Sequence, residues 1–302
     1  MGILVSVVIP CTDRTEGLEK CLLSAMNQDL IGNIEVIVVE NNSIDRKVVP
    51  DIVKKLGSSK LKHHYLEHCI NANIARNFGT QAASGEYVAY LDSDDFWNAD
   101  HLSSKLRVLS DSNAQAIYGG ANINKGNRIT CKTGFPLKSI LNSASPALEY
   151  LFGEKAGFAQ TSSYLLKRSV ALEVKWDDAL SRNQDYDFFI RVENCIGWDY
   201  DPNVTYTIMW AAGVGRNHHF NSYKLFFLRY KTLMTHFQAS NYLFDRMLEA
   251  SLRDKESYQW FRCEFAKIEG FERFSIKGML SINRLSMCVA WFAREYVVFG
   301  RK

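Results

Sequence analysis

Four polar residues, Asp92-Ser93-Asp94-Asp95, directly follow an apolar run that ends at Leu91. The run is typical of a buried strand in a parallel sheet, and ligands of open α/β sheets gather where such strands end. Carboxylates one residue apart at such an edge suit a hard divalent cation, because Mg²⁺ typically takes one or two carboxylates together with substrate phosphates. A polar loop that only caps the next helix is the alternative interpretation.

The elements before this tetrad alternate between strand and helix signals. Apolar runs predict strands at 5–9, stopped by Pro10, and at 34–39, an extended stretch near 64–66 and a strand at 87–91. Helical spacing predicts helices from about residue 18, with Thr15 as N-cap, at 46–56, and from Asn73 until Gly85 closes it. Strands separated by helices imply βαβ units, so we predict an α/β fold with a mostly parallel twisted sheet.

Length and composition place the chain among globular proteins. It has 302 residues, of which 47% are hydrophobic, enough for one large domain or two unequal ones. Its seven cysteines are scattered without a CxxC pair, which favours reduced thiols and a cytoplasmic location. The apolar amino terminus lacks a basic leader, so we expect no signal peptide, and no run of 18 apolar residues predicts a membrane span.

Charge divides the chain unevenly. Residues 1–215 carry 21 basic and 25 acidic side chains, whereas residues 216–302 carry 15 and 8 and hold 18 of the 38 aromatic residues. Apolar residues recur at helical spacing from about residue 221, and we predict a helical subdomain over 216–302. Its last helix, at 276–299, is amphipathic, so residues 271–302 could contact an anionic membrane surface. Simple packing on the rest of the protein is the alternative, and we expect no nucleic-acid partner.

Four segments, in this order, resemble the family 2 glycosyltransferases. They are Val-Ser-Val-Val-Ile-Pro at 5–10, Glu-Val-Ile-Val-Val-Glu-Asn-Asn-Ser-Ile-Asp at 35–45, Ala-Arg-Asn-Phe-Gly at 75–79 and Gly-Glu-Tyr-Val-Ala-Tyr-Leu-Asp-Ser-Asp-Asp at 85–95. The resemblance implies a GT-A fold over 1–215, with a nucleotide-binding half at 1–110 and an acceptor-binding half at 111–215.

The resemblance also implies roles for individual residues. Asp94 should bind a divalent cation, Mg²⁺ or Mn²⁺, with Asp92 near the ribose or the metal's water shell and a late histidine, His218 or His219, as a further ligand. Asp95 is expected to cap a helix that starts around Asn98. Many family members have two aspartates where this chain has Glu40-Asn41. The nucleotide-sugar is expected to contact Pro10, Thr12, Glu40, Asn41, Arg76, Asp92 and Ser93.

Asp185, in Asn183-Gln184-Asp185, matches the family's catalytic carboxylate, with Gln184 in place of the usual acidic neighbour. An acceptor hydroxyl has a very high pKa, so its attack needs a base within hydrogen-bond reach. The alternative is that Asp185 only caps the next helix, and Asp187 could compensate for the missing acid. Trp176 is a candidate for stacking on a sugar ring, with core packing as the alternative.

The resemblance therefore implies an inverting, metal-assisted enzyme that moves a sugar from a nucleotide-sugar, expected to be a UDP-sugar. The acceptor would be a hydroxyl of a glycan or lipid-linked glycan, and the enzyme would be cytoplasmic or peripheral on the inner face of the membrane. One alternative is a nucleotidyltransferase, which usually has a glycine- and arginine-rich loop after the first strand, where residues 11–17 contain one glycine. A non-catalytic scaffold with the same fold is another.

Overall fold

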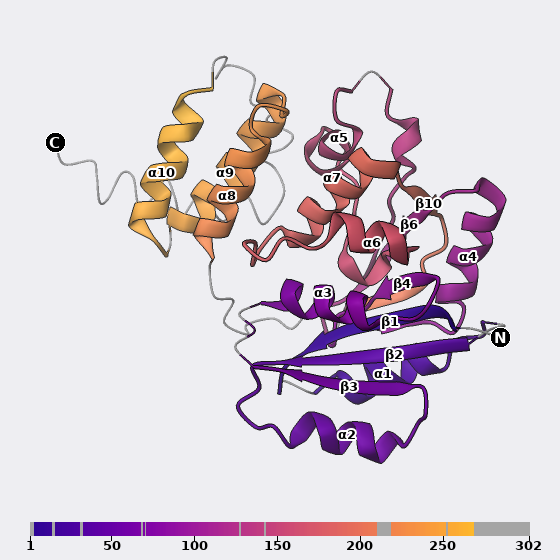
Figure 1. Cartoon of the computed structure of the whole chain (residues 1–302). Coiled ribbons are helices and arrows are strands. Elements are labelled where there is room, and N and C mark those ends of the chain that lie inside the picture. Colours follow the sequence, from indigo (N-terminus) through magenta and orange to yellow (C-terminus); the bar gives the residue numbers. More distant parts are fainter. Residues whose placement is uncertain are drawn as a thin grey trace. The chain divides into compact units, whose positions relative to one another are not determined.

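The computed structural model describes residues 3–13, 16–30, 33–67, 69, 71–126, 128–141, 143–209, 219–251 and 253–268. The chain forms two compact units (Figure 1). The first consists of Met1–Leu151 and Ala156–Asn217, and the second of Phe152–Lys155 and His218–Lys302. The predicted boundaries at residues 110 and 215 stay predictions.

A seven-stranded sheet lies at the centre of the first unit. Its strands are β1 Ile3–Cys11, β2 Asn33–Asn41, β3 Leu61–Leu66, β4 Tyr87–Tyr90, β6 Ala116–Gly119, β9 Leu165–Lys167 and β10 Asp199–Asp201. The strand order is β10-β6-β9-β4-β1-β2-β3, and only β9 runs antiparallel to its neighbours. The predicted α/β fold with a mostly parallel sheet is confirmed.

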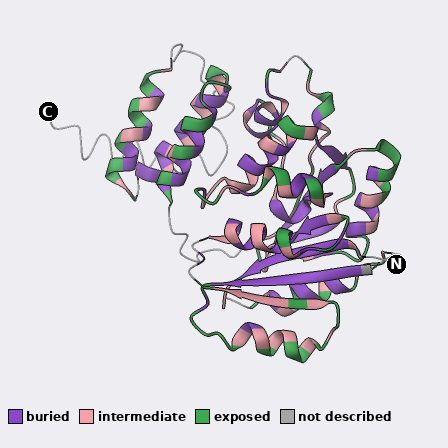
Figure 2. Cartoon of the chain, in the orientation of Figure 1, coloured by how far each residue is buried: buried purple, intermediate pink, exposed green. Residues whose placement is uncertain are grey.

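Helices cover both faces of this sheet, which is why its strands read as continuous apolar runs. On one face, Val7 and Ile9 of β1 pack in the same buried cluster as Leu22. On the other face, Gly79 lies so close to β1 that an added Cβ would be 2.4 Å from Val8 Cγ1. Figure 2 shows the buried strands between helices whose outer surfaces are exposed. The helices of this part are α1 Leu18–Met26, α2 Val48–Leu56, α3 Ala72–Ala82, α4 His101–Ser112, α5 Pro146–Phe152, α6 Arg168–Val174 and α7 Gln184–Ile196.

A second, four-stranded sheet begins where the acidic tetrad ends. Its strands are β5 Phe96–Trp97, β7 Ala121–Asn124, β8 Ile129–Lys132 and β11 Tyr206–Met209, in the order β5-β11-β7-β8. Because β4 ends at Tyr90 and β5 starts at Phe96, the tetrad lies in the connection between the two sheets.

The first strand differs from its prediction, because β1 continues through Pro10 to Cys11. The Val8 carbonyl accepts a hydrogen bond from Leu91 N, on the side of β4. Backbone groups of alternate residues in a strand face the same neighbouring strand, so the nitrogen of Pro10, like the carbonyl of Val8, faces β4. The last β4 residue paired with β1 is Tyr90, opposite Val8, so Pro10 lies beyond the paired part of β4. The missing N–H of proline therefore costs no hydrogen bond at this position.

Two expected helix ends also differ. The N-cap of α1 is Gly17, and Thr15 lies outside the described residues. The helix α3 ends at Ala82, before Gly85, whose backbone N donates to Ser6 Oγ at 2.8 Å. An added Cβ at Gly85 would lie 2.7 Å from Ser6 N, so the glycine permits a close approach and does not cap the helix.

The described part of the second unit is helical, as predicted. It contains α8 Phe220–Tyr230, α9 His236–Ser251 and α10 Lys255–Ala266. Aromatic side chains form much of its core, with Phe226 stacked 5.5 Å from Tyr242. The predicted amphipathic helix at 276–299 lies outside the described residues. Within the described ranges, no helix has both the length and the hydrophobicity needed to cross a bilayer.

Candidate active site

The carboxyl ends of the parallel strands β1, β2 and β4 meet at one edge of the main sheet, because Cys11 of β1 pairs with Glu40 of β2 and β4 runs beside β1. The acidic tetrad follows β4 at this edge. It packs against the start of α1, where an added Cβ on Gly17 would lie 3.3 Å from Asp94 Cα. Gly17 is the one glycine in residues 11–17, after β1. Its presence was the only feature of the sequence that indicated this close packing.

Two side chains from other elements hold the first carboxylate of the tetrad. Arg76 of α3 donates from Nη2 to Asp92 Oδ1 at 2.7 Å, and Gln160 donates from Nε2 to Asp92 Oδ2 at 3.1 Å. The Arg76 residue is only 2% exposed. Arg76 is therefore not part of a surface ion pair, because its guanidinium is buried beside the tetrad.

Asp95 is an internal anchor of the tetrad. The residue is 2% exposed, and its Oδ2 accepts from Ser162 Oγ at 2.7 Å while its Oδ1 accepts from Met209 N at 3.2 Å. Burial, with the charges of Asp92 and Asp94, raises its pKa well above the usual range. The expectation that Asp95 caps the next helix is wrong, because α4 starts at His101 with Asp100 at its N-cap.

Asp94 is the exposed aspartate of the tetrad, next to the partly exposed Ser93. Partial burial of its carboxyl group and the nearby charge of Asp92 raise the pKa of Asp94 to about 6. A carboxylate that its surroundings compensate incompletely is stabilised by a bound cation. Among the described residues, no three His, Cys, Asp or Glu side chains are placed to hold a metal together.

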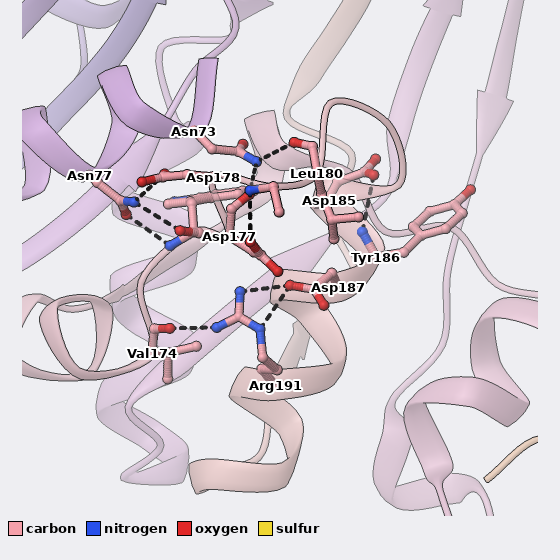
Figure 3. Close-up of polar contacts among 12 residues, drawn as sticks. Asn73, Asn77, Val174, Asp177, Asp178, Leu180, Asp185, Tyr186, Asp187 and Arg191 are labelled. Atoms are coloured by element: carbon pink, nitrogen blue, oxygen red, sulfur yellow. Dashed lines mark hydrogen bonds and ion pairs between the residues drawn. The ribbon is translucent and has the colours of Figure 1, made fainter. Parts of the chain in front are cut away.

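Asp185 is the second residue of α7, and the polar contacts around it are drawn in Figure 3. Its Oδ1 accepts from Tyr186 N at 3.0 Å, and its main-chain oxygen accepts from Tyr164 Oη at 3.2 Å. Burial raises the pKa of Asp185 to about 6; Asp92 adds to the shift, whereas the Tyr186 bond and Arg76 oppose it. Asp185 therefore shares an electrostatic environment with the tetrad. The N-cap of α7 is Asn183, so Asp185 is not the capping residue.

Asp187 is not available as a substitute acid. The residue is fully buried, and its Oδ2 accepts from Arg191 Nε at 2.8 Å and lies 2.7 Å from Arg191 Nη2 (Figure 3). The same guanidinium also donates to the Val174 carbonyl. The pair fixes α7 to the end of α6, which is a structural role.

The predicted nucleotide contacts at the ends of β1 and β2 lie at the same edge. Pro10 pairs with Val39, and Thr12 follows the end of β1. Glu40 is fully buried and its Oε2 lies 2.8 Å from Nε2 of His63, on β3. Asn41 is 8% exposed. The pairing of Glu40 with His63 was missed, and no signal in the sequence connects two residues on neighbouring strands whose pairing is unknown.

Two further candidates for sugar or metal contact have different outcomes. Trp176 is 2% exposed and stacks on Phe188 with ring centroids 4.1 Å apart, so it is a core residue. Trp176 also contacts Arg76, whose Cζ lies 4.6 Å from the Trp176 ring centre, within cation–π range. His218 lies outside the described residues, and His219 is an exposed residue of the second unit, directly before α8.

Comparisons with known proteins agree with this architecture. The chain aligns over 87% of its length with the crystal structure of S. aureus TarS 1–349 in complex with UDP, covering 80% of that chain with a TM-score of 0.62 and 17% identity. The crystal structure of TarS 1–349 in complex with UDP-GlcNAc gives a TM-score of 0.59 at 16% identity, over 95% of this chain and 79% of that one. The fold is thus that of the GT-A glycosyltransferases.

The sequence comparisons define the family. The profile described as Glycosyl transferase family 2 matches residues 6–170. The chain is 33% identical over 234 residues to the amylovoran biosynthesis glycosyltransferase AmsB of Erwinia amylovora, covering 74% of this chain and 76% of AmsB. It is 30% identical over 139 residues to the UDP-Glc:alpha-D-GlcNAc-diphosphoundecaprenol beta-1,3-glucosyltransferase WfgD of Escherichia coli, covering 46% of this chain and 54% of WfgD. The chain belongs to glycosyltransferase family 2 and is a glycosyltransferase.

Proposed function

We propose that this enzyme inverts the anomeric centre of a sugar while moving it from a UDP-sugar to a hydroxyl of a glycan or lipid-linked glycan. The observation that carries this proposal is the pair of carboxyl groups, Asp94 and Asp185, with pKa values raised to about 6 around one Arg76–Asp92 ion pair. Carboxyl groups with perturbed pKa values that share one electrostatic environment are typical of catalytic sites. The names of WfgD and of the TarS complexes, with UDP-Glc, UDP and UDP-GlcNAc, support UDP as the nucleotide.

The donor would lie along the carboxyl ends of β1, β2 and β4. In this arrangement Pro10, Thr12, Glu40 and Asn41 surround the base and ribose, and Asp92 and Ser93 approach the ribose. Arg76 suits a place near the diphosphate, because its guanidinium offers donors in a rigid fork. Its bonds to Asp92 and Asn73, at 2.7 and 2.9 Å, hold that fork in a fixed direction.

A divalent cation, Mg²⁺ or Mn²⁺, fits the residues of the tetrad. Asp94 is an exposed oxygen ligand with an incompletely compensated charge, whereas Asp92 is already bound by Arg76 and Gln160. Asp94 would therefore hold the cation directly and Asp92 through its water shell, with substrate phosphate oxygens as further ligands. The ligand role of His218, which lies outside the described residues, stays a prediction. When bound, such a cation supplies Lewis-acid stabilisation of the negative charge on the departing diphosphate.

Asp185 would act as the general base. Its carboxylate accepts the proton of the acceptor hydroxyl as the hydroxyl oxygen attacks the anomeric carbon from the face opposite the diphosphate. The bond from the anomeric carbon to the diphosphate oxygen breaks, and the configuration inverts. A pKa near 6 suits this role, since Asp185 is ionised at neutral pH and is a stronger base than an ordinary aspartate.

The two alternative functions have lost their support. A nucleotidyltransferase does not agree with membership of a glycosyltransferase family. A non-catalytic scaffold would not need the tetrad and Asp185 in one electrostatic environment. Turnover of a UDP-sugar would exclude the scaffold directly.

The site of action follows from the acceptor. A lipid-linked acceptor would place the enzyme on the cytoplasmic face of the membrane, bound peripherally. The segment expected to make that contact, 271–302, lies outside the described residues. Flotation with anionic vesicles, with and without residues 271–302, tests the membrane contact. Equal recovery of both proteins would refute it.

The central experiment is a panel of UDP-sugars, including UDP-glucose and UDP-GlcNAc, incubated with the full chain and Mn²⁺ or Mg²⁺. We expect one donor to release UDP in a reaction that EDTA stops. Release from GDP-sugars alone would contradict the assignment of the nucleotide, and release unaffected by EDTA would contradict the cation.

A further inference from the structure

Three asparagines, at the N-cap and in the first two turns of α3, bind the loop that leads to Asp185. We call these residues, Asn71, Asn73 and Asn77, the asparagine clamp. The loop, 176–180, is part of the connection between α6 and α7, and Figure 3 shows Asn73 and Asn77 facing it. None of the three asparagines is assigned a direct contact with the donor or the acceptor in the proposed function.

The side chains of the other two members of the clamp, Asn71 and Asn77, bind the loop, and that of Asn71 also caps α3. Asn77 donates from Nδ2 to the Trp176 carbonyl at 2.8 Å and accepts from Trp176 N at 2.8 Å. It also donates to Asp178 Oδ1 at 3.0 Å. Asn71 caps α3 and donates to the Asp178 carbonyl at 2.6 Å. These bonds replace the water that an irregular loop would otherwise need.

Asn73 differs because it binds the loop and the donor site together. Its Nδ2 donates to the carbonyls of Asp177 and Leu180, at 2.7 and 2.8 Å, across 104 and 107 residues of sequence. Its Oδ1 accepts from Arg76 Nη1 at 2.9 Å, and Arg76 in turn donates to Asp92. The residue is 1% exposed, so these bonds are shielded from competing water.

We propose that Asn73 is a positioning residue that sets the distance between the general base Asp185 and the Arg76–Asp92 pair. One buried amide joins the two halves of the reaction centre: it fixes the arginine through its oxygen and the base-bearing loop through its nitrogen. Leu180, the last clamped residue, lies five positions before Asp185, so little chain separates the clamp from the base. This inference rests on the proposed role of Asp185.

Small displacements of a catalytic group have large kinetic effects, up to about 100-fold per ångström. Asn73→Ser removes all three links without adding charge, and serine is tolerated in the first turn of a helix. The matched control is Asn77→Ser, which loosens the same loop from the same helix but leaves Arg76 bound. The positive control is Asp185→Asn.

The assay measures UDP release from the most active UDP-sugar of the panel, with water as acceptor and saturating Mn²⁺. For Asn73→Ser we expect kcat to fall by about 10- to 100-fold, with the donor KM changed less than about threefold. For Asn77→Ser we expect kcat within about threefold of the wild type. The acid limb of the kcat profile should move to lower pH in Asn73→Ser, because Asp185 gains water when the Leu180 carbonyl is released. Asn77→Ser keeps the bond to Leu180 and should keep the wild-type limb.

A second variant covers the possibility that Asn73→Ser does not fold. Asn73→Asp has the same shape and keeps the acceptor for Arg76, but it lacks both donors to the loop. We expect the same loss of kcat with little change in donor KM. Retention of wild-type kcat by either folded variant would overturn the inference, and so would equal losses in Asn73→Ser and Asn77→Ser. If Asp185→Asn itself keeps full activity, the proposed function fails at the base, which is a different result.

Discussion

Carboxyl groups near the two ends of the strands in the main sheet have pKa values that are shifted in opposite directions. Glu35, near the start of β2, accepts hydrogen bonds from Ser6 Oγ, from the backbone N and Oγ of Ser84, and from Lys62 Nζ. Burial alone would raise its pKa, but these bonds outweigh it, and the pKa of Glu35 falls to about 2. Around the Arg76–Asp92 pair, beyond the carboxyl end of β4, burial raises the pKa values of Asp94 and Asp185 to about 6.

The difference separates a structural carboxylate from functional ones. Glu35 joins β1, β2, β3 and the turn before β4, and its charge is fully compensated by the protein. Asp94 and Asp185 receive less compensation and have the like charge of Asp92 nearby. Such groups are suited to bind a species from outside the protein, which would be a cation for Asp94 and a proton for Asp185. Substitutions of the two kinds of carboxylate should therefore have different consequences.

The largest effect is expected for Asp185→Asn. An amide of the same shape cannot accept the acceptor's proton, so turnover should fall by about 10²- to 10⁴-fold. UDP affinity in the presence of Mn²⁺, measured by calorimetry, should stay within about twofold of the wild type. A loss of UDP affinity as large as that of Asp94→Ala would contradict the role of Asp185 as base.

Asp94→Ala should affect turnover through the cation. We expect UDP binding in Mn²⁺ to weaken by at least about tenfold, or about 1.4 kcal/mol, and to lose its dependence on the metal. Asp100→Ala is the matched control, since Asp100 is an exposed aspartate that makes no side-chain cap on α4. Equal UDP affinity of the two variants in Mn²⁺ would contradict the proposal that the tetrad binds the cation.

The pH profile should show an acid limb near pH 6. A base is active as the carboxylate, so a pKa raised to about 6 means that kcat falls as pH drops through this value, by about tenfold per pH unit. Protonation of Asp94 would release the cation in the same range. Saturating Mn²⁺ competes with that protonation. The remaining acid limb of the kcat profile should then report the protonation of Asp185. A limb near pH 4 would indicate an ordinary aspartate.

The smallest effect is expected for the structural carboxylate. Glu35→Gln should lower the free energy of unfolding at pH 7 by about 1–3 kcal/mol, because buried hydrogen-bond donors lose a charged acceptor. The folded-state pKa of Glu35 lies below the unfolded value, so its contribution is present above about pH 4.5 and is lost as pH falls toward 2. Urea unfolding at pH 7 and pH 3 measures this change. A difference between wild type and variant that does not shrink at pH 3 would contradict the mechanism, and kcat at 25 °C should be unchanged.

Local patterns were sufficient for the elements and for the carboxylates that terminate them. The apolar runs of β1, β2 and β4 and the polar turns after them placed Asp92, Asp94 and the end of β2 at one edge, because parallel strands align their ends. The same reasoning failed for Pro10 and Asp95. Whether proline ends a strand depends on the length of the neighbouring strand, and whether an aspartate caps a helix depends on what else can bind it.

The residues that hold the site together could not be predicted from the sequence, and the reason is the same for each of them. Gln160 meets Asp92 across 68 positions, and Asn73 meets Leu180 across 107. Periodicity is a property of a single element and carries no information on which distant side chains will meet. The environment of Asp185 is similar, since the charges that shift its pKa belong to the loop after β4 and to α3.

The amino-acid sequence by itself determined the fold class, the family resemblance and the identity of the acidic residues at the sheet edge, because these depend on residue type and short-range order. Only the tertiary structure decided which carboxylates are compensated and which are not. Burial and hydrogen-bond partners set that balance, and both arise from contacts between parts of the chain that lie far apart in sequence.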